Sequence, residues 1–248
     1  MAPLVILYST AYRQWEKALP TQLELFNKIT DDPMFGIHYW TTVPWLQQMG
    51  YYAFAPSQPP EAIRKWPYKH TITDQTKEFY ETIARVVGYK KLVLPVAYFL
   101  FSTKIALENA EALWRERYGT EMPDDQPVLR IRPDLKFETT DNFPVIPTSN
   151  NYYVSNWNRL HRPTWNPNAP EVGDVMCLTT KRIIKDLVNF NPENLEALTE
   201  KYRARGRDVW FSEQYLWTIL EENGVDVIQD ENIHLSIETC DGGLNKLC

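Results

Sequence analysis

The chain has 248 residues, of which 44% are hydrophobic and 23% are charged, and its formal net charge is −6. This is an ordinary globular balance, and the chain is long enough to form one large domain with its own core. The negative charge argues against a general affinity for the backbone of nucleic acids.

Cysteine usage and hydropathy indicate the compartment. The three cysteines, Cys177, Cys240 and Cys248, lack a metal-ligand spacing such as C-x-x-C, and their small, odd number is typical of a reducing environment. The first residues carry no basic segment and too short an apolar run for a secretory signal. No stretch approaches the roughly 20 apolar residues of a membrane span. We therefore expect a soluble, cytoplasmic protein.

The first third of the chain predicts alternating strands and helices. Residues 4–8 form a continuous apolar run, the pattern of a buried parallel strand. A helix with one apolar face is predicted over 15–29 and a second strand over 35–42. A proline-rich stretch over 44–60 then leads to a helix predicted over 73–87.

The middle of the chain predicts a long helix, a short strand and a loop. The helix covers 93–118 and ends at Gly119, which suits a C-cap. The strand covers 128–131 and ends before Pro133, because proline cannot extend a central ladder. Residues 148–170 are irregular, and a loop of that length in a compact domain is usually functional or mobile.

The last third predicts shorter elements. Ser212 is expected to cap the helix that ends at Asn223 and Gly224. The predicted elements are a strand over 175–178, helices over 179–188, 191–205 and 212–222, and strands over 225–228 and 233–237. No repeat or composition break divides the chain.

Polar residues follow the first predicted strand. Ser9, Thr10 and Arg13 combine hydroxyls with a cation, a set that suits a bound nucleotide. The same residues also suit the N-cap of the helix that follows, and both interpretations remain open.

The stretch over 126–137 carries the strongest candidate site. Arg130 and Arg132 alternate with apolar residues, so both guanidinium groups are expected to leave one face of the strand, and Asp134 follows the strand end. Ligands of open α/β sheets bind outside the carboxyl ends of strands, and two cations with a carboxylate suit a phosphate-bearing ligand, with or without a metal. The alternative is an edge strand with a solvated salt bridge.

The loop over 148–170 is rich in asparagine and aromatic residues. Tyr153, Trp157 and Trp165 could stack on the C–H faces of a sugar acceptor while amides bond its hydroxyls. The alternative is a solvent-exposed lid without a specific ligand.

The motif R-x-R-P-D-L-x-F over residues 130–137, after a long helix, resembles one in small glycosyltransferase-like proteins of bacterial polysaccharide clusters and large DNA viruses. The resemblance implies an α/β fold: a single GT-A-like, Rossmann-like domain over 1–248 with a mixed, mostly parallel central sheet flanked by helices. It also implies a nucleotide-binding half over 1–137 and an acceptor and catalytic half over 138–248.

The same resemblance implies transfer of a sugar from a UDP- or GDP-linked donor to a hydroxyl acceptor. Asp134 matches the aspartate that meets the ribose or a divalent metal, Mn²⁺ or Mg²⁺, on the diphosphate. His234 resembles a late histidine that can complete such a metal site. The chain departs from the usual D-x-D because Arg132 replaces the first carboxylate, so Arg130 and Arg132 are expected to neutralise the diphosphate if no metal binds.

The acceptor and the base stay open. The expected acceptor is a glycan, a lipid-linked sugar, a protein or a hydroxylated base of phage DNA, the last of which needs a basic cleft. An inverting transfer needs a carboxylate base, for which Asp174 and Glu213 are the candidates. Asp174 also suits a turn, and Glu213 also suits the first turn of a helix. A different reading is a sugar-binding protein without catalysis. The lysines of the candidate basic cleft are Lys65, Lys69, Lys90 and Lys91.

Overall fold

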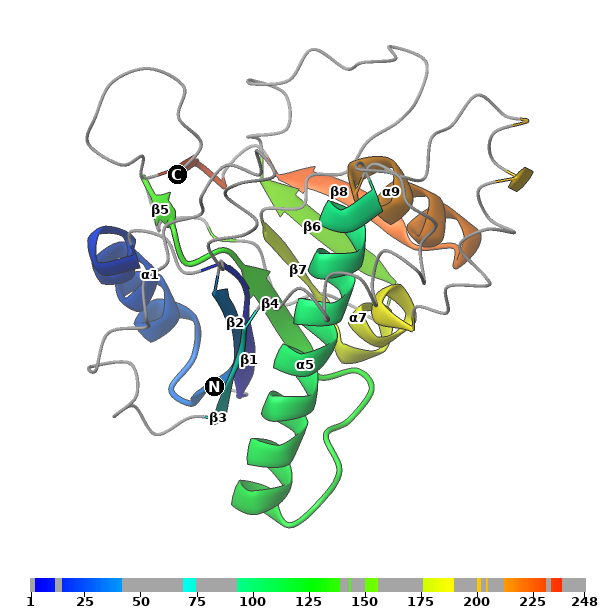
Figure 1. Cartoon of the computed structure of the whole chain (residues 1–248). Coiled ribbons are helices and arrows are strands. Elements are labelled where there is room, and N and C mark those ends of the chain that lie inside the picture. The colour runs from blue at the N-terminus through cyan, green and yellow to red at the C-terminus, as the bar shows by residue number, and fades with distance from the viewer. Residues whose placement is uncertain are drawn as a thin grey trace.

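The computed structural model describes residues 3–11, 15–41, 69–74, 93–138, 143, 150–155, 176–189, 200–201, 204, 212–230 and 233–237. These residues form an α/β fold (Figure 1). Its elements are β1 (Leu4–Ala11), α1 (Trp15–Ile29), β2 (Pro33–Thr41), β3 (Lys69–Asp74), α5 (Val93–Tyr118), β4 (Pro127–Ile131), β5 (Leu135–Phe137), β6 (Asn151–Ser155), β7 (Met176–Thr180), α7 (Lys181–Val188), α9 (Ser212–Glu222), β8 (Asp226–Asp230) and β9 (Leu235–Ile237).

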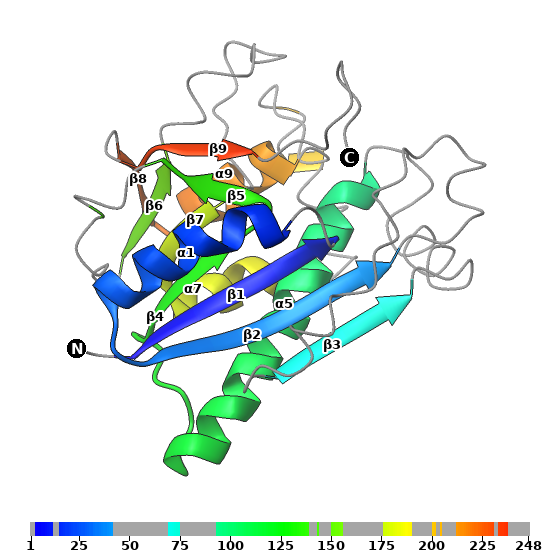
Figure 2. The same cartoon turned by 90° about the vertical axis from the view of Figure 1, so that its left-hand side faces the viewer.

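A seven-stranded sheet in the order β3-β2-β1-β4-β7-β6-β8 forms the centre of the fold. β1 pairs in parallel with β2 and β4, β2 pairs in parallel with β3, and Figure 2 shows β1, β2 and β3 with their arrowheads at the same end. β7 runs antiparallel to β4 and β6, and β8 is parallel to β6. The predicted mixed, mostly parallel sheet is therefore confirmed. A separate pair, β5 and β9, is antiparallel.

Helices cover both faces of this sheet because the side chains of each strand alternate between them. Ile6 and Tyr8 of β1 pack with Phe26 of α1 in one buried cluster. Val5 and Leu7 pack on the opposite face with α5, in a second cluster that also includes side chains of α7 and α9. α5 has 26 residues, yet no helix in the described part of the chain is long and apolar enough to cross a membrane.

Gly36 of β2 lets α5 approach the sheet closely. A Cβ atom at this position would lie 2.1 Å from the carbonyl oxygen of Ala106 and 2.7 Å from the Cβ atom of Ala110. Both alanines belong to α5 and are fully buried. The absence of a side chain at Gly36, together with small residues on the helix, therefore sets the spacing between α5 and β2.

Side-chain bonds fix the end of α5 and the start of α7. The guanidinium of Arg117 lies 2.7 Å from the carboxylate of Asp32, and the hydroxyl of Tyr118 also bonds this carboxylate. Gly119 ends the helix with a φ of 69°, the conformation predicted for its C-cap. Lys181, which opens α7, is buried and donates to the carbonyl of Met122 at 2.6 Å, so it ties α7 to the loop after α5.

Several predicted elements differ from the structure. α1 and α5 have the predicted bounds, but the predicted helix over 73–87 is wrong at its start, because residues 73 and 74 belong to β3. The predicted loop over 148–170 contains β6. Residues 179 and 180, predicted to open a helix, end β7 instead. Most of the predicted helix over 191–205 lies outside the described residues.

Candidate functional site

The strand order reverses between β1 and β4. From β1 the chain adds β2 and then β3 on one side, and it later returns to add β4 on the other side of β1. Ligands of open α/β sheets bind where the strand order reverses in this way, outside the carboxyl ends of the strands. We call the end of the sheet where β1 to β4 finish the carboxyl edge. Tyr8 pairs with Ile131, the last residue of β4, so the last residues of β1 extend beyond β4 at this edge.

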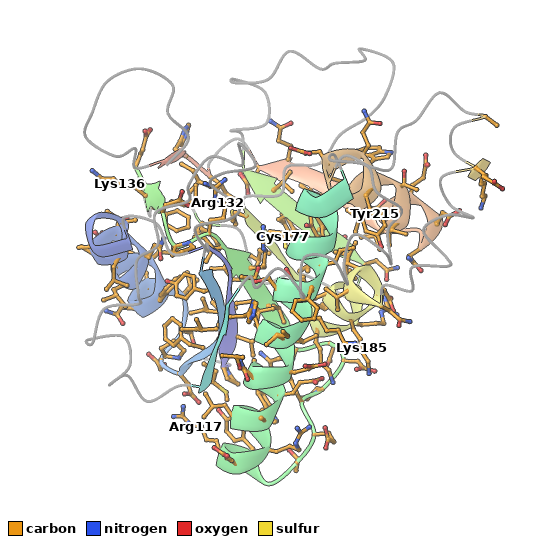
Figure 3. The ribbon with its side chains drawn as sticks, in the orientation of Figure 1. Arg117, Arg132, Lys136, Cys177, Lys185 and Tyr215 are labelled. Carbon is orange, nitrogen blue, oxygen red and sulfur yellow. The ribbon has the colours of Figure 1, made fainter. Side chains whose placement is uncertain are left out.

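Arg132 and Asp134 form an ion pair in the turn directly after β4. Arg132 Nε donates to Asp134 Oδ1 at 3.0 Å and Arg132 Nη2 donates to Asp134 Oδ2 at 2.6 Å. The side chain of Asp134 is 2% exposed and that of Arg132 is 15% exposed. The alternative of a solvated salt bridge on an edge strand is therefore wrong, because the carboxylate is buried and β4 lies between β1 and β7. Figure 3 shows Arg132 on the side of the molecule where Lys136 of β5 lies, far from Arg117.

Gln22 of α1 bonds the backbone of this turn. Its Nε2 donates to the carbonyl of Leu135 at 2.6 Å and to that of Pro133 at 3.3 Å. Its Oε1 accepts a hydrogen bond of 2.5 Å from the hydroxyl of Tyr8. Gln22 is fully buried, and backbone carbonyls can only accept hydrogen bonds, so the Nε2 end of the amide faces the turn. These bonds hold the backbone of the turn against α1.

Arg130 binds β1 instead of sharing a site with Asp134. Its Nε donates to Ser9 Oγ at 3.0 Å and its Nη2 donates to the carbonyl of Ser9 at 3.3 Å. Ser9 Oγ also bonds Thr103 Oγ1 of α5 at 3.0 Å. Arg130 is 3% exposed and points to the face of the sheet that α5 covers, where neighbouring Val128 packs. The structure thus brings Ser9 and Arg130 together and gives the two arginines different partners.

His38 lies next to this cluster on the same face. Ser9 pairs with His38 across β1 and β2, and His38 Nδ1 lies 2.7 Å from Ser102 Oγ of α5. Burial lowers the pKa of His38 from 6.5 to about 4, so the imidazole is neutral at pH 7. A buried, neutral imidazole with a hydroxyl partner fits a structural role.

Cys177 lies on the other side of Arg130. The two residues pair across β4 and β7. Burial raises the pKa of the Cys177 thiol, and the hydrogen bond with Tyr152 and the charge of Arg130 offset part of that rise. The thiol is therefore protonated at neutral pH, and it acts as a small apolar group against α5 (Figure 3).

Glu213 lies in the first turn of α9. Only the residues 223–225 separate α9 from β8, and β8 runs in the direction of β4, so the N-terminus of α9 points toward the carboxyl edge. Glu213 is 9% exposed and the next residue, Gln214, is also buried. A carboxylate at this position is favoured by the helix dipole.

The described residues do not fit the expected metal site. Asp134 directly precedes β5, whereas His234 directly precedes β9, and these antiparallel strands pair Leu135 with Ile237. Asp134 and His234 therefore stand at opposite ends of the pair, about four residues or ~13 Å apart. Both carboxylate oxygens of Asp134 already accept bonds from Arg132. Among the residues that the structure describes, no three His, Cys, Asp or Glu side chains form a group that could hold an ion.

Among the other predicted site residues, only Tyr153 lies wholly within the described part of the structure. Tyr153 lies within β6, where its side chain is half-buried and its hydroxyl accepts a bond of 3.2 Å from Asn151. Thr10 belongs to β1, but its side chain is outside the described part of the structure. Four further candidates lie entirely outside the described residues: Arg13, Trp157, Trp165 and Asp174.

Sequence reasoning missed Gln22, Ser102 and Thr103. A signal was present in each case: Gln22 lies on the apolar face of α1, beside Leu19 and Phe26, where a polar side chain needs a partner. Ser102 and Thr103 are adjacent hydroxyls in an otherwise apolar part of α5. Buried polar residues at apolar positions therefore mark the contacts that shape this edge of the sheet.

Comparisons with known proteins give little further guidance. No protein-family model and no curated protein matches the sequence. Among solved structures, the chain is similar to the apo form of mouse xyloside xylosyltransferase 1, with 11% sequence identity and a TM-score of 0.38, over 92% of this chain and 85% of that chain. A similarity at this level carries no argument about fold or activity.

Proposed function

We propose that the protein is a glycosyltransferase that moves a sugar from a nucleotide-sugar to a hydroxyl acceptor. The observation that carries this proposal is the pair Arg132 and Asp134, fixed at the position between β1 and β4 where open α/β sheets bind nucleotides. Ser9 and Arg130 add a second polar anchor between the same two strands.

The arginines suit the charge of the leaving group. Breaking an anomeric C–O bond builds negative charge on the departing diphosphate, and fixed donors that meet this charge lower the barrier. Arg132 is partly exposed, whereas Arg130 is buried and bonds Ser9. Because the described residues do not fit a metal, we assign no step to one.

The proton of the acceptor hydroxyl needs a base if configuration inverts. Glu213 is our candidate within the described residues, because the start of α9 points toward the carboxyl edge. Asp174 is the other candidate, two residues before β7 in the sequence, and β7 starts at this edge because Met176 pairs with Ile131. Tyr153, Trp157 and Trp165 remain candidates for acceptor binding. The donor is a UDP- or GDP-linked sugar, and the acceptor is a glycan or a hydroxylated DNA base.

A screen of nucleotide-sugars tests the proposal. We expect UDP or GDP to raise the melting temperature of the full chain, and one UDP- or GDP-sugar to be hydrolysed or transferred. Both effects should persist in EDTA. A sugar-binding protein without catalysis would respond to free glycans and to neither nucleotide.

Asp134→Ala provides the residue-level test of the same proposal. The variant should keep the fold but lose most of its transfer activity, because Arg132 loses both of its carboxylate bonds. A folded Asp134→Ala protein with full activity would show that the site lies elsewhere.

A further inference from the structure

We infer that Asp134 is a positioning residue: it orients Arg132 to bind a diphosphate and does not itself touch the ligand. This inference rests on the proposed function and deepens it, since it assigns how the same site recognises its anionic ligand. The resemblance implied a different role for Asp134, as a ligand of a metal or of the ribose.

The geometry of the ion pair supports this assignment. Arg132 uses Nε and Nη2, which form the lateral fork of the guanidinium, to bind both oxygens of Asp134. A planar guanidinium has a second, terminal fork formed by Nη1 and the other hydrogen of Nη2. This terminal fork has the geometry that phosphate oxygens prefer.

Exposure separates the two side chains. Asp134 is 2% exposed, so a ligand approaching from solvent has almost no access to its oxygens. Arg132 is 15% exposed, so the guanidinium forms the outer member of the pair. A ligand at the carboxyl edge therefore meets the cation first, with the carboxylate behind it.

Hydrogen bonds from α1 also hold the backbone around the ion pair. Gln22 bonds the carbonyls of Pro133 and Leu135, which flank Asp134 on both sides. The hydroxyl of Tyr8 in turn bonds the oxygen of the Gln22 amide. Arg132 thus starts from a fixed base and loses little conformational freedom when it binds an anion, which increases affinity.

Charge and orientation predict opposite effects for one substitution. Asp134→Asn removes a negative charge beside the cation, so the Coulomb term alone predicts tighter binding of an anion. If Asp134 instead orients Arg132, the loss of the paired carboxylate frees the guanidinium and weakens binding. The sign of the change in affinity therefore distinguishes the two effects.

The experiment is calorimetric titration of the full chain with inorganic pyrophosphate in the presence of EDTA. The variants are Asp134→Asn and Arg132→Lys, and Glu121→Gln is the matched control. Glu121 pairs with exposed Arg115 at 3.1 Å near the far end of α5, so this variant makes the same charge change away from the site. Lysine at position 132 keeps the charge but cannot form the two parallel hydrogen bonds to the carboxylate of Asp134.

We expect wild type to bind pyrophosphate equally well with EDTA and with Mn²⁺. Asp134→Asn and Arg132→Lys should each bind roughly ten-fold more weakly, while Glu121→Gln should bind like wild type. Arg132→Lys keeps the test valid if Asp134→Asn does not fold. Unchanged or tighter binding by Asp134→Asn, unchanged binding by Arg132→Lys, or a need for Mn²⁺ would each overturn the inference.

The outcome also separates this inference from the proposed function. If UDP binds and sugar is transferred but Asp134→Asn retains wild-type affinity for pyrophosphate, the function stands and the positioning role fails. If pyrophosphate binding depends on the pair but no nucleotide-sugar is used, the positioning role stands and the transferase fails. If wild type binds neither pyrophosphate nor UDP, both are wrong.

Discussion

Gln22→Leu is the substitution that most directly tests how the carboxyl edge is built. Leucine has a similar volume but cannot bond the hydroxyl of Tyr8 or the carbonyls of Pro133 and Leu135. The side chain of Gln22 and the ring of Tyr8 are fully buried, so water cannot easily replace the lost amide. The variant therefore leaves up to three buried polar groups without their present partner.

The bond lengths indicate how large the loss should be. The bonds to Tyr8 and to Leu135 are short, at 2.5 and 2.6 Å, whereas the bond to Pro133 is 3.3 Å and weaker. Leaving a buried polar group unsatisfied costs about 1–3 kcal/mol, so two strong losses amount to roughly 3 kcal/mol. For a chain of this size each kcal/mol lowers the melting temperature by about 2–4 °C, which predicts a fall of roughly 6–12 °C.

Urea denaturation of a double-mutant cycle measures this effect. In a Tyr8→Phe background, Gln22→Leu no longer leaves a hydroxyl unsatisfied, so it should cost about 1 kcal/mol less than in wild type. The two single variants should therefore be non-additive. Strict additivity, or a Gln22→Leu protein as stable as wild type, would refute the proposed role of the Gln22 amide.

Two further variants test α5 and its contacts with β2. Gly36→Ala should destabilise the fold by about 1–3 kcal/mol, because its Cβ would lie 2.1 Å from the Ala106 carbonyl oxygen; adding Ala110→Gly should recover part of this loss, and an unchanged melting temperature would contradict the close approach. His38 has its pKa lowered to about 4, so below pH 6.5 the unfolded chain gains a proton that the folded chain does not take up. Stability should therefore fall by about 3 kcal/mol between pH 6.5 and 4, and this dependence should be absent from His38→Gln when both proteins are unfolded in urea across that range.

Elements with a strong local signal were predictable. α1 and α5 have their predicted bounds because an apolar face and a glycine C-cap are encoded within the helix itself. β3 was missed because its sequence, KHTITD, is short and polar, and the strand exists through its pairing with β2. β6 was missed for a similar reason: Tyr152 and Val154 are buried by α5 and its neighbours, which lie far away in the sequence.

The candidate site likewise combines a contact between near neighbours in the sequence with a contact between distant residues. The pair Arg132 and Asp134 is two residues apart, so its approximate location was visible in the sequence. The contact between Arg130 and Ser9 spans 121 residues, and it depends on β1 and β4 being neighbours. No local pattern encodes that neighbourhood, which explains why both arginines were expected to serve one ligand.

The contacts along α5 have a consequence for how the protein opens. The 26 residues of α5 span about 39 Å. The helix contacts β2 through Ser102 with His38 and through the close approach at Gly36, and it contacts Asp32, just before β2, through Arg117. Two of these contacts, at Ser102 and at Gly36, are buried, whereas the ion pair of Arg117 with Asp32 is partly exposed. Amide hydrogens from Ser102 to Trp114 should therefore exchange with solvent only when the whole chain unfolds, and this part of the helix should open as one unit with the sheet.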